Sequence, residues 1–359
     1  EEGLTPKLLE EVGELGLLGS SVPEELGGLG LDFKSTMLIT ESMGGAHSFA
    51  VSFSAHTGIA TLPILYYGND AQKQKYVPGL ATGELKGCYC LTEPGSGSDA
   101  NSGKTSAKLN EAGTHYVLNG QKMWITNGTQ ADWMCMLANT SEGAPHKNKS
   151  LIIVPLDAPG VHIEKKLDKH GMRASDTALI FFDDVRVPRR HLIGEREGEG
   201  FVQQMMQFQD ECIWGAANTV AILEESLKIT VEYLRERKTF GQPLIHNQFI
   251  HFKIAEMSTE LEALRALTYR AAALHAERGA MSPEVIRLAS MAKLKSGRLS
   301  RELLDWCVQF HGGMGYMFET RINRIYRDVR VISIGGGADE IMLGVIAKLE
   351  GNTPPQKRG

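Results

Sequence analysis

Two segments in the middle of the chain carry groups that could bind a flat, polar cofactor. Segment 91–99 (LTEPGSGSD) follows an apolar run, and its glycines could present backbone N–H groups to a phosphate or a heterocycle. Segment 119–128 (NGQKMWITNG) sets Trp124 and Thr126 two residues apart, an aromatic face beside a hydroxyl. Taken singly, the first could be a surface turn and the second a hairpin with a core tryptophan. Segment 91–99 lacks the Lys-Ser/Thr ending of a P-loop and the βαβ surroundings of a dinucleotide fingerprint.

Three segments nearer the C-terminus carry further candidate groups. Segment 237–241 (RKTFG) begins with an arginine, which suits bidentate phosphate contact but also complements a helix C-terminus. Segment 309–316 (QFHGGMGY) ends a helix in glycines that permit close backbone approach. His311 could act as a base there, although a lone histidine at a helix end is more often structural. The glycine triplet of segment 334–341 (IGGGADEI) precedes a helix whose first N–H groups are free for an anion or a carbonyl.

Helical, then alternating, then helical patterns must position these segments. Helical spacing is expected over residues 5–18 and 33–82, with breaks near Pro63 and residues 68–69. Short apolar runs with turn residues between them, including Asn-Gly at 119–120 and 127–128, favour an antiparallel sheet or small barrel. The expected strands are 89–92, 115–118, 134–138, 151–155 and 178–182. Long helices from residue 200, over 248–279, over 283–311 and from about residue 337 indicate a four-helix bundle.

The predicted fold class is therefore α+β and multidomain. We expect a helical N-terminal domain over residues 1–86 and a central antiparallel β-domain over residues 87–196. A C-terminal four-helix bundle would cover residues 197–350, with a tail at 351–359.

Composition excludes several other classes. Of the 359 residues 42% are hydrophobic and 23% charged, and the net charge of -5 does not suit a nucleic-acid-binding protein. Five scattered cysteines do not form a disulfide framework, and no metal site is expected from Cys88 and Cys90. No apolar run is expected to approach the roughly 18 residues of a membrane span, and no signal peptide is visible. The chain starts at Glu1 without a methionine, so a targeting segment could have been lost.

The five segments, in this order and spacing, resemble the acyl-CoA dehydrogenase family over about residues 4–349. The combination of LTEPGSGSD, NGQKMWITNG, RKTFGQ and QFHGGMGY is highly specific. The resemblance implies the acyl-CoA dehydrogenase fold, with one family helix missing before Glu1. It also implies FAD bound between domains and subunits, a homotetramer or dimer, an acyl-CoA substrate and an electron-transferring flavoprotein as acceptor. Such enzymes of fatty acid β-oxidation lie in the bacterial cytoplasm or the mitochondrial matrix.

The resemblance also assigns cofactor and substrate contacts to individual positions. Trp124 is implied to stack near the isoalloxazine and Thr126 to approach its N5. The flavin, its ribityl chain or its phosphates are implied to contact Leu91, Thr92 and Ser98. The pyrophosphate and adenosine half of a neighbouring subunit's FAD is implied to contact Arg237, Phe240, Gln248, Gln309 and Gly313. The substrate is implied to contact Ser98, Phe208 and Gly335.

The expected catalytic base is where this chain departs from many relatives. They carry Tyr-Glu-Gly-Thr where residues 335–338 are GGGA, so the usual glutamate position is Gly336, which has no side chain. Isovaleryl-CoA and long-chain dehydrogenases carry the base on the long helix before the RKTFG-type motif, where Glu211 stands 26 positions before Arg237. Asp210 next to it is a competitor. Gly336 could still supply a backbone N–H to the enolate oxygen.

These expectations predict an FAD-dependent α,β-dehydrogenation of an acyl-CoA to the trans-2-enoyl-CoA. A carboxylate would take the α-proton. Loss of the Tyr-Glu pair should widen the acyl pocket, which favours a branched or medium to long chain, and residues 208–218 look most like citronellyl-CoA-type dehydrogenases. Cys212 replaces an arginine of relatives and is expected to pack as a small apolar residue. The alternatives are a flavin oxidase or monooxygenase, and a non-catalytic acyl-CoA binding protein.

Overall fold

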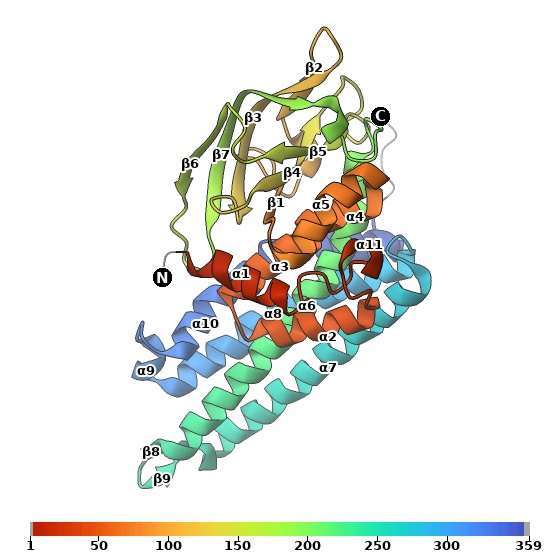
Figure 1. Ribbon diagram of the computed structural model, residues 1–359. Helices are drawn as coiled ribbons and strands as arrows, with labels where there is room; N and C mark the ends of the chain where they lie inside the picture. The colour runs from red at the N-terminus through yellow and green to blue at the C-terminus, as the bar shows by residue number, and fades with distance from the viewer. Residues whose placement is uncertain (1–2, 355–359) are drawn as a thin grey trace. The chain divides into compact units, whose positions relative to one another are not determined.

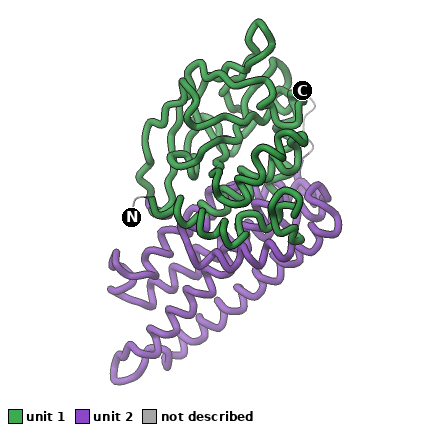
Figure 2. Tube along the Cα trace, in the orientation of Figure 1, with its two compact units in different colours: residues 1–32, 51–169, 173–208 green, residues 33–50, 170–172, 209–359 purple. Residues whose placement is uncertain are grey.

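The computed structural model describes residues 3–354, which separate into two compact units (Figure 2). Unit 1 comprises Glu1–Asp32, Val51–Lys169 and Arg173–Phe208. Unit 2 comprises Phe33–Ala50, His170–Met172 and Gln209–Gly359. The predicted domain boundaries stay predictions, and residues 355–359 of the predicted tail lie outside the described residues.

Unit 1 is built on a seven-stranded sheet with the order β1-β4-β2-β3-β7-β6, in which β5 also pairs with β4 (Figure 1). Its strands are β1 (Gly87–Cys90), β2 (Ser106–Leu109), β3 (His115–Thr126), β4 (Trp133–Asn139), β5 (Lys149–Pro155), β6 (Val161–Lys166) and β7 (Thr177–Pro188). Most neighbours are antiparallel, as expected, but β4 is parallel to both β1 and β2. The sheet is therefore mixed at this edge.

Strand β4 is buried on both faces, which explains its nearly continuous apolar sequence. Met134 and Met136 belong to a core that includes residues of β3 and β7. Trp133 and Cys135 belong to a second core with helical residues of the same unit. The pleat sends alternate side chains to opposite faces, so one strand serves both cores.

The helices of unit 1 are α1 (Leu4–Glu14), α4 (Leu62–Tyr67), α5 (Asp70–Thr82) and most of α3 (Ser48–Ser54). The unit also contains the π-helical turn η2 (Ala55–Thr61) and the short 3₁₀ turns η1 (Glu24–Leu26), η3 (Ala100–Ser102) and η4 (Arg189–His191). Residues of α4, α5, η1 and η2 pack in that second core. Helix α5 begins with a reciprocal capping box between Asn69 and Gln72. Buried His56 joins three elements, because its ring bonds the Leu80 carbonyl at 2.8 Å and the Gly87 N–H at 3.1 Å.

Unit 2 is helical apart from the two-stranded β8–β9 hairpin (Lys238–Thr239, Gln242–Pro243). The long helices α6 (Gly200–Glu236), which enters this unit at Gln209, α7 (Gln248–Arg278) and α8 (Pro283–His311) run alongside one another (Figure 1). The shorter helices are α2 (Phe33–Gly44), α9 (Gly313–Tyr316), α10 (Arg321–Val329) and α11 (Asp339–Leu349), with the 3₁₀ turns η5 (Leu244–His246) and η6 (Arg330–Ser333). Apolar clusters of α6, α7 and α8 form the centre of the bundle.

Several local predictions are wrong. Asn119-Gly120 is not a turn but lies inside β3, where a register shift against β7 absorbs the glycine. The first helix was expected to reach residue 18 but ends at Glu14. A helix break was expected near Pro63, but Pro63 lies in the first turn of α4, where proline is tolerated. Strands β2 and β6 and helix α10 were not expected.

The helical run Ser48–Tyr67 is apolar and long enough to cross a membrane. However, 72% of its most apolar 18-residue window is buried inside the protein.

All five cysteines are free and buried. Their burial agrees with the expectation that no disulfide framework is present. The thiol of Cys212 packs in an apolar cluster with Met37 and Trp214, and burial raises its pKa to about 12. Cys212 therefore behaves as a small apolar core residue, as predicted.

Candidate active site

In unit 1, the loop after β1 is fastened to β3 beside Trp124. The Met123 N–H donates to the Thr92 carbonyl at 2.9 Å, and Lys122 Nζ donates to the Leu91 carbonyl at 2.9 Å. Three of the expected flavin contacts, Leu91, Thr92 and Trp124, therefore lie together. The residues come from motifs that are about 30 positions apart in the sequence.

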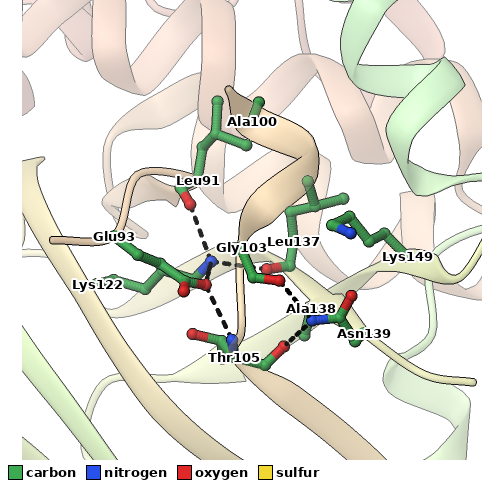
Figure 3. A pocket seen from close by; sticks show the side chains of 10 residues that line it. All are labelled: Leu91, Glu93, Ala100, Gly103, Thr105, Lys122, Leu137, Ala138, Asn139 and Lys149. Atoms are coloured by element: carbon green, nitrogen blue, oxygen red, sulfur yellow. Dashed lines mark hydrogen bonds and ion pairs between the residues drawn. The ribbon is translucent and has the colours of Figure 1, made fainter. Parts of the chain in front are cut away.

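A buried ion pair secures this arrangement, and the sequence analysis missed it. Lys122 Nζ bonds Glu93 at 2.9 Å and the Leu137 carbonyl at 2.8 Å, so its three protons are all used (Figure 3). Glu93 also accepts hydrogen bonds from the N–H groups of Lys104 and Thr105. Although burial acts against ionisation, Lys122 and these donors hold the pKa of Glu93 below its usual value. In the sequence, only the opposite charges of Glu93 and Lys122 in the two motifs could have indicated this ion pair.

Trp124 presents an exposed aromatic face. It lies at a bulge between Met123 and Ile125, with φ at +60°, and 56% of its surface is exposed. A tryptophan with a left-handed backbone is strained, and such strain gathers at functional positions. The bulge turns the indole out of the sheet, next to the half-buried Thr126.

These residues fit a planar cofactor with polar edges. Among the described residues, neither the Thr92 nor the Thr126 hydroxyl has a hydrogen-bond partner. A β-carbon added to Gly95 or Gly97 would meet nothing within 4 Å, so the loop leaves room for a bulky group. Ser98 is exposed on the same loop. A flat aromatic face, free hydroxyls and an open glycine loop can stack on and hydrogen-bond a planar cofactor such as a flavin nucleotide.

In unit 2, Glu211 of α6 lies against the glycine triplet that precedes α11. A β-carbon added to Gly336 would lie 3.0 Å from Glu211 Oε1. Gly336 has φ at +60°, and its N–H has no acceptor among residues 3–354. Burial raises the pKa of Glu211 to about 7, and the Lys293 charge opposes part of that rise. A carboxylate and a free N–H therefore sit side by side.

The neighbouring Asp210 has a different environment. Its carboxylate binds His275 Nε2 at 2.5 Å, and the His275 ring stacks on Phe33 at 3.9 Å between centroids. Asp210 is buried in this contact, so it is engaged in holding α6 to α7. Glu211, by contrast, has no hydrogen-bond partner in the described part of the chain.

Lys293 of α8 is a second residue that the sequence analysis missed. It is 4% exposed, and its Nζ donates to the Ile332 carbonyl at 2.6 Å and to the Gly337 carbonyl. These carbonyls flank Gly335 and Gly336. Burial lowers the pKa of Lys293 from its usual value. A lysine at an otherwise apolar helix position was the only sign of it in the sequence.

The remaining predicted cofactor residues lie between the end of α6 and the start of α7, and around the end of α8. Tyr233 joins the ends of α6 and α8, because its ring stacks on His311 at 4.4 Å and its hydroxyl donates to the His311 carbonyl. His311 is buried and also bonds the Cys307 carbonyl, which supports a structural role. Exposed positions nearby in the sequence are Arg237, Phe240, Gln248, Gln309 and Gly313. Gly335 is exposed beside Gly336, and Phe208 is half-buried on α6 in unit 1.

Sequence models of acyl-CoA dehydrogenases match the chain in three consecutive parts. The N-terminal domain matches residues 1–84, the middle domain residues 88–185 and the C-terminal domain residues 198–349. The chain is 39% identical over 340 residues to the mitochondrial short-chain specific acyl-CoA dehydrogenase of Rattus norvegicus, covering 94% of this chain and 81% of the relative. It is 41% identical over 344 residues to an acyl-CoA dehydrogenase of Bacillus subtilis, covering 95% and 89%.

Solved structures give the same result. An acyl-CoA dehydrogenase complexed with FAD from Bacillus anthracis superposes with a TM-score of 0.91 at 37% identity, covering 99% of this chain and 65% of that one. The butyryl-CoA dehydrogenase of Megasphaera elsdenii superposes with a TM-score of 0.90 at 34% identity, covering 95% and 89%. The predicted fold and the predicted enzyme class are confirmed. The chain belongs to the acyl-CoA dehydrogenase family, whose cofactor is FAD.

Proposed function

We propose that this enzyme removes the α-proton of an acyl-CoA with Glu211 and forms the trans-2-enoyl-CoA. One observation carries the proposal: Glu211 Oε1 lies 3.0 Å from where a side chain on Gly336 would begin. The carboxylate thus stands where the motif comparison expects the usual glutamate of many relatives. Asp210, the competitor, is paired with His275.

The environment of Glu211 suits a general base. An ordinary glutamate is a weak base, whereas a carboxyl with a pKa of about 7 combines ionisation at neutral pH with a stronger pull on the proton. The free Gly336 N–H can donate to the thioester oxygen as negative charge develops on it. Bound FAD would supply the acceptor for the hydride that leaves the β-carbon.

The cofactor contacts divide into two sets. Leu91, Thr92, Ser98, Trp124 and Thr126 would hold the flavin of their own subunit. The partner subunit's FAD would be held by Arg237, Phe240, Gln248, Gln309 and Gly313. All residues of the second set are exposed in a single chain, which is consistent with contacts to a partner subunit's FAD.

The proposed assembly is a homotetramer or dimer. Several large aromatic side chains of unit 2 are exposed and would be available to a partner subunit: Phe240, Phe249, Phe252, Tyr316 and Phe318. Light scattering of the purified protein should give two or four subunits, and a monomer with full FAD content would contradict this assignment.

The proposed substrates are branched or medium to long acyl-CoAs. Glycines at 335 and 336 leave the region beside Glu211 without side chains, and the nearest atoms to a β-carbon on Gly335 belong to Val331 at 3.6 Å. Ser98 and Phe208 would contribute further substrate contacts. A panel of straight, branched and aromatic acyl-CoAs tests this, with bleaching of the flavin under anaerobic conditions as the signal. A clear preference for butyryl-CoA would overturn the substrate class and leave the reaction intact.

The proposed electron acceptor is an electron-transferring flavoprotein. Anaerobically reduced enzyme should reoxidise slowly in air and rapidly with that acceptor. Rapid reoxidation by O₂ alone would instead indicate a flavin oxidase. Purified protein that binds neither FAD nor acyl-CoA would indicate a non-catalytic relative.

A further inference from the structure

One face of helix α8 holds the loop that carries Gly336. Lys293 binds the Ile332 and Gly337 carbonyls, and Arg301 binds Asp339 at 3.1 Å. Between them, Gly297 lets the loop lie directly on the helix, because a β-carbon there would come within 2.8 Å of Ser333 Oγ. The three residues are four positions apart, so they form a single stripe along the helix.

The two ends of this loop are fixed by different kinds of contact. At Asp339 the contact is an ion pair with a partly exposed arginine, which water can replace in part. At Lys293 it is a pair of charge-assisted hydrogen bonds from a buried cation, which are stronger. The position of Gly336 relative to α6 therefore depends mainly on Lys293.

The charge of Lys293 also acts on Glu211. The two side chains form no ion pair among the described residues, because the lysine protons are directed at carbonyls. The groups around Lys293 are Glu211 and Cys212 on α6 and Asp339 on α11, and the carboxylate of Asp210 is instead bound to His275. Asp339 in turn is shared with Arg298 and Arg301. Burial raises the pKa of Glu211, and the charge of Lys293 opposes part of that rise.

Resting on the proposed function, we propose that Lys293 is a positioning residue for the reaction. It holds the Gly336 N–H and the Glu211 carboxylate in a fixed relation through the Ile332 and Gly337 carbonyls. Its charge also favours the ionised form of the base. Lys293 touches neither substrate nor cofactor in this role.

The test compares Lys293→Met, Lys293→Arg and Lys295→Met as holoenzymes. Lys295 is two residues away on α8 and pairs with Glu260 at the surface, so its variant controls for loss of a lysine from this helix. Lys293→Met should keep its FAD, but its flavin should be reduced by saturating acyl-CoA at least about tenfold more slowly than in wild type. The acid limb of its pH–rate profile, where the rate falls with falling pH, should move to higher pH by about one unit. Lys293→Arg should keep the acid limb near wild type, and Lys295→Met should match wild type in both.

The outcomes separate the inference from the proposed base. If Glu211→Gln abolishes flavin reduction but Lys293→Met leaves rate and acid limb unchanged, the positioning role is wrong. The same holds if Lys293→Met lowers only the melting temperature, since that is what a purely structural lysine would do. If Lys293→Met fails to fold, Lys293→Arg decides: a wild-type rate and acid limb supports the role, and an acid limb moved to higher pH despite the retained charge overturns it. Full activity of Glu211→Gln would refute the proposed base instead.

Discussion

Glu211 Oε1 lies 3.0 Å from the point that a β-carbon on Gly336 would occupy. Two residues that are 125 positions apart in the chain therefore lie next to each other in unit 2. In the proposed function, this relation lets Glu211 supply the carboxylate that Gly336 cannot. It also means that residues 211 and 336 cannot both carry full side chains without displacement.

Exchanging the two residues should move the base across the site. Glu211→Ala should slow flavin reduction by about 10²- to 10⁴-fold, the usual contribution of a general base. Adding Gly336→Glu should recover at least about tenfold of that loss, although φ of +60° at residue 336 costs a side chain about 1–2 kcal/mol. Stopped-flow reduction of the double and single variants measures this. Equal rates in both would show that the two positions do not serve one carboxylate.

The rate of flavin reduction should depend on pH near neutrality. Burial raises the pKa of Glu211 to about 7, and only the ionised carboxylate can accept a proton. The second-order rate constant of flavin reduction, measured at low substrate concentration, should therefore rise as the pH increases through about 7 and level off above it. A profile that is flat from pH 6 to 8 would indicate an ordinary carboxylate.

Removing Lys122 should release the loop that carries the proposed flavin contacts Leu91 and Thr92. Lys122→Met leaves Glu93 buried without its cation, which typically costs about 3–5 kcal/mol. It also frees the Leu91 carbonyl, so FAD content should fall along with the free energy of unfolding. The matched variant Lys104→Met removes an exposed lysine beside the same loop and should keep both. Normal FAD content in Lys122→Met would show that the ion pair does not organise the site.

His56 should make the protein less stable in mild acid. Burial lowers the pKa of His56 to about 4, against about 6.5 in an unfolded chain. Below pH 6.5 the unfolded state binds the extra proton first, so the stability contributed by the neutral ring is complete above that pH. It should be lost progressively as the pH falls towards 4, on the order of 3 kcal/mol in total. Denaturant unfolding of His56→Gln should show a shallower acid slope than wild type; an identical slope would contradict this.

The order of elements could be predicted because residues typical of helix starts and stops mark the boundaries of the long helices in the sequence. Helix α8 starts after Ser282 with Pro283 and stops at a glycine, and the structure agrees with both predicted limits. Strand β6 could not be found in the same way. Five of its six residues are exposed, so it lacks the alternation that marks a half-buried strand.

The motifs of the candidate site could be predicted from the sequence, but the residues that hold the site in place could not. Glu211 and Asp210 look alike in sequence, and only the fold brings His275 to one of them. Lys293 binds two backbone carbonyls, which leave no side-chain partner to recognise. Asn119-Gly120 has the composition of a turn, yet pairing of β3 with β7 on both sides converts it into a bulge.

Anaerobic mixing of Glu211→Gln holoenzyme with its best acyl-CoA tests the account most directly. Glutamine keeps the shape of the side chain but cannot accept the α-proton. The variant should bind FAD and acyl-CoA normally, and its flavin should stay oxidised or bleach at least about 100-fold more slowly than wild type. Glu232→Gln removes an exposed carboxylate from the same helix and should bleach like wild type. Bleaching of Glu211→Gln at the wild-type rate would contradict the assignment of Glu211 as the base.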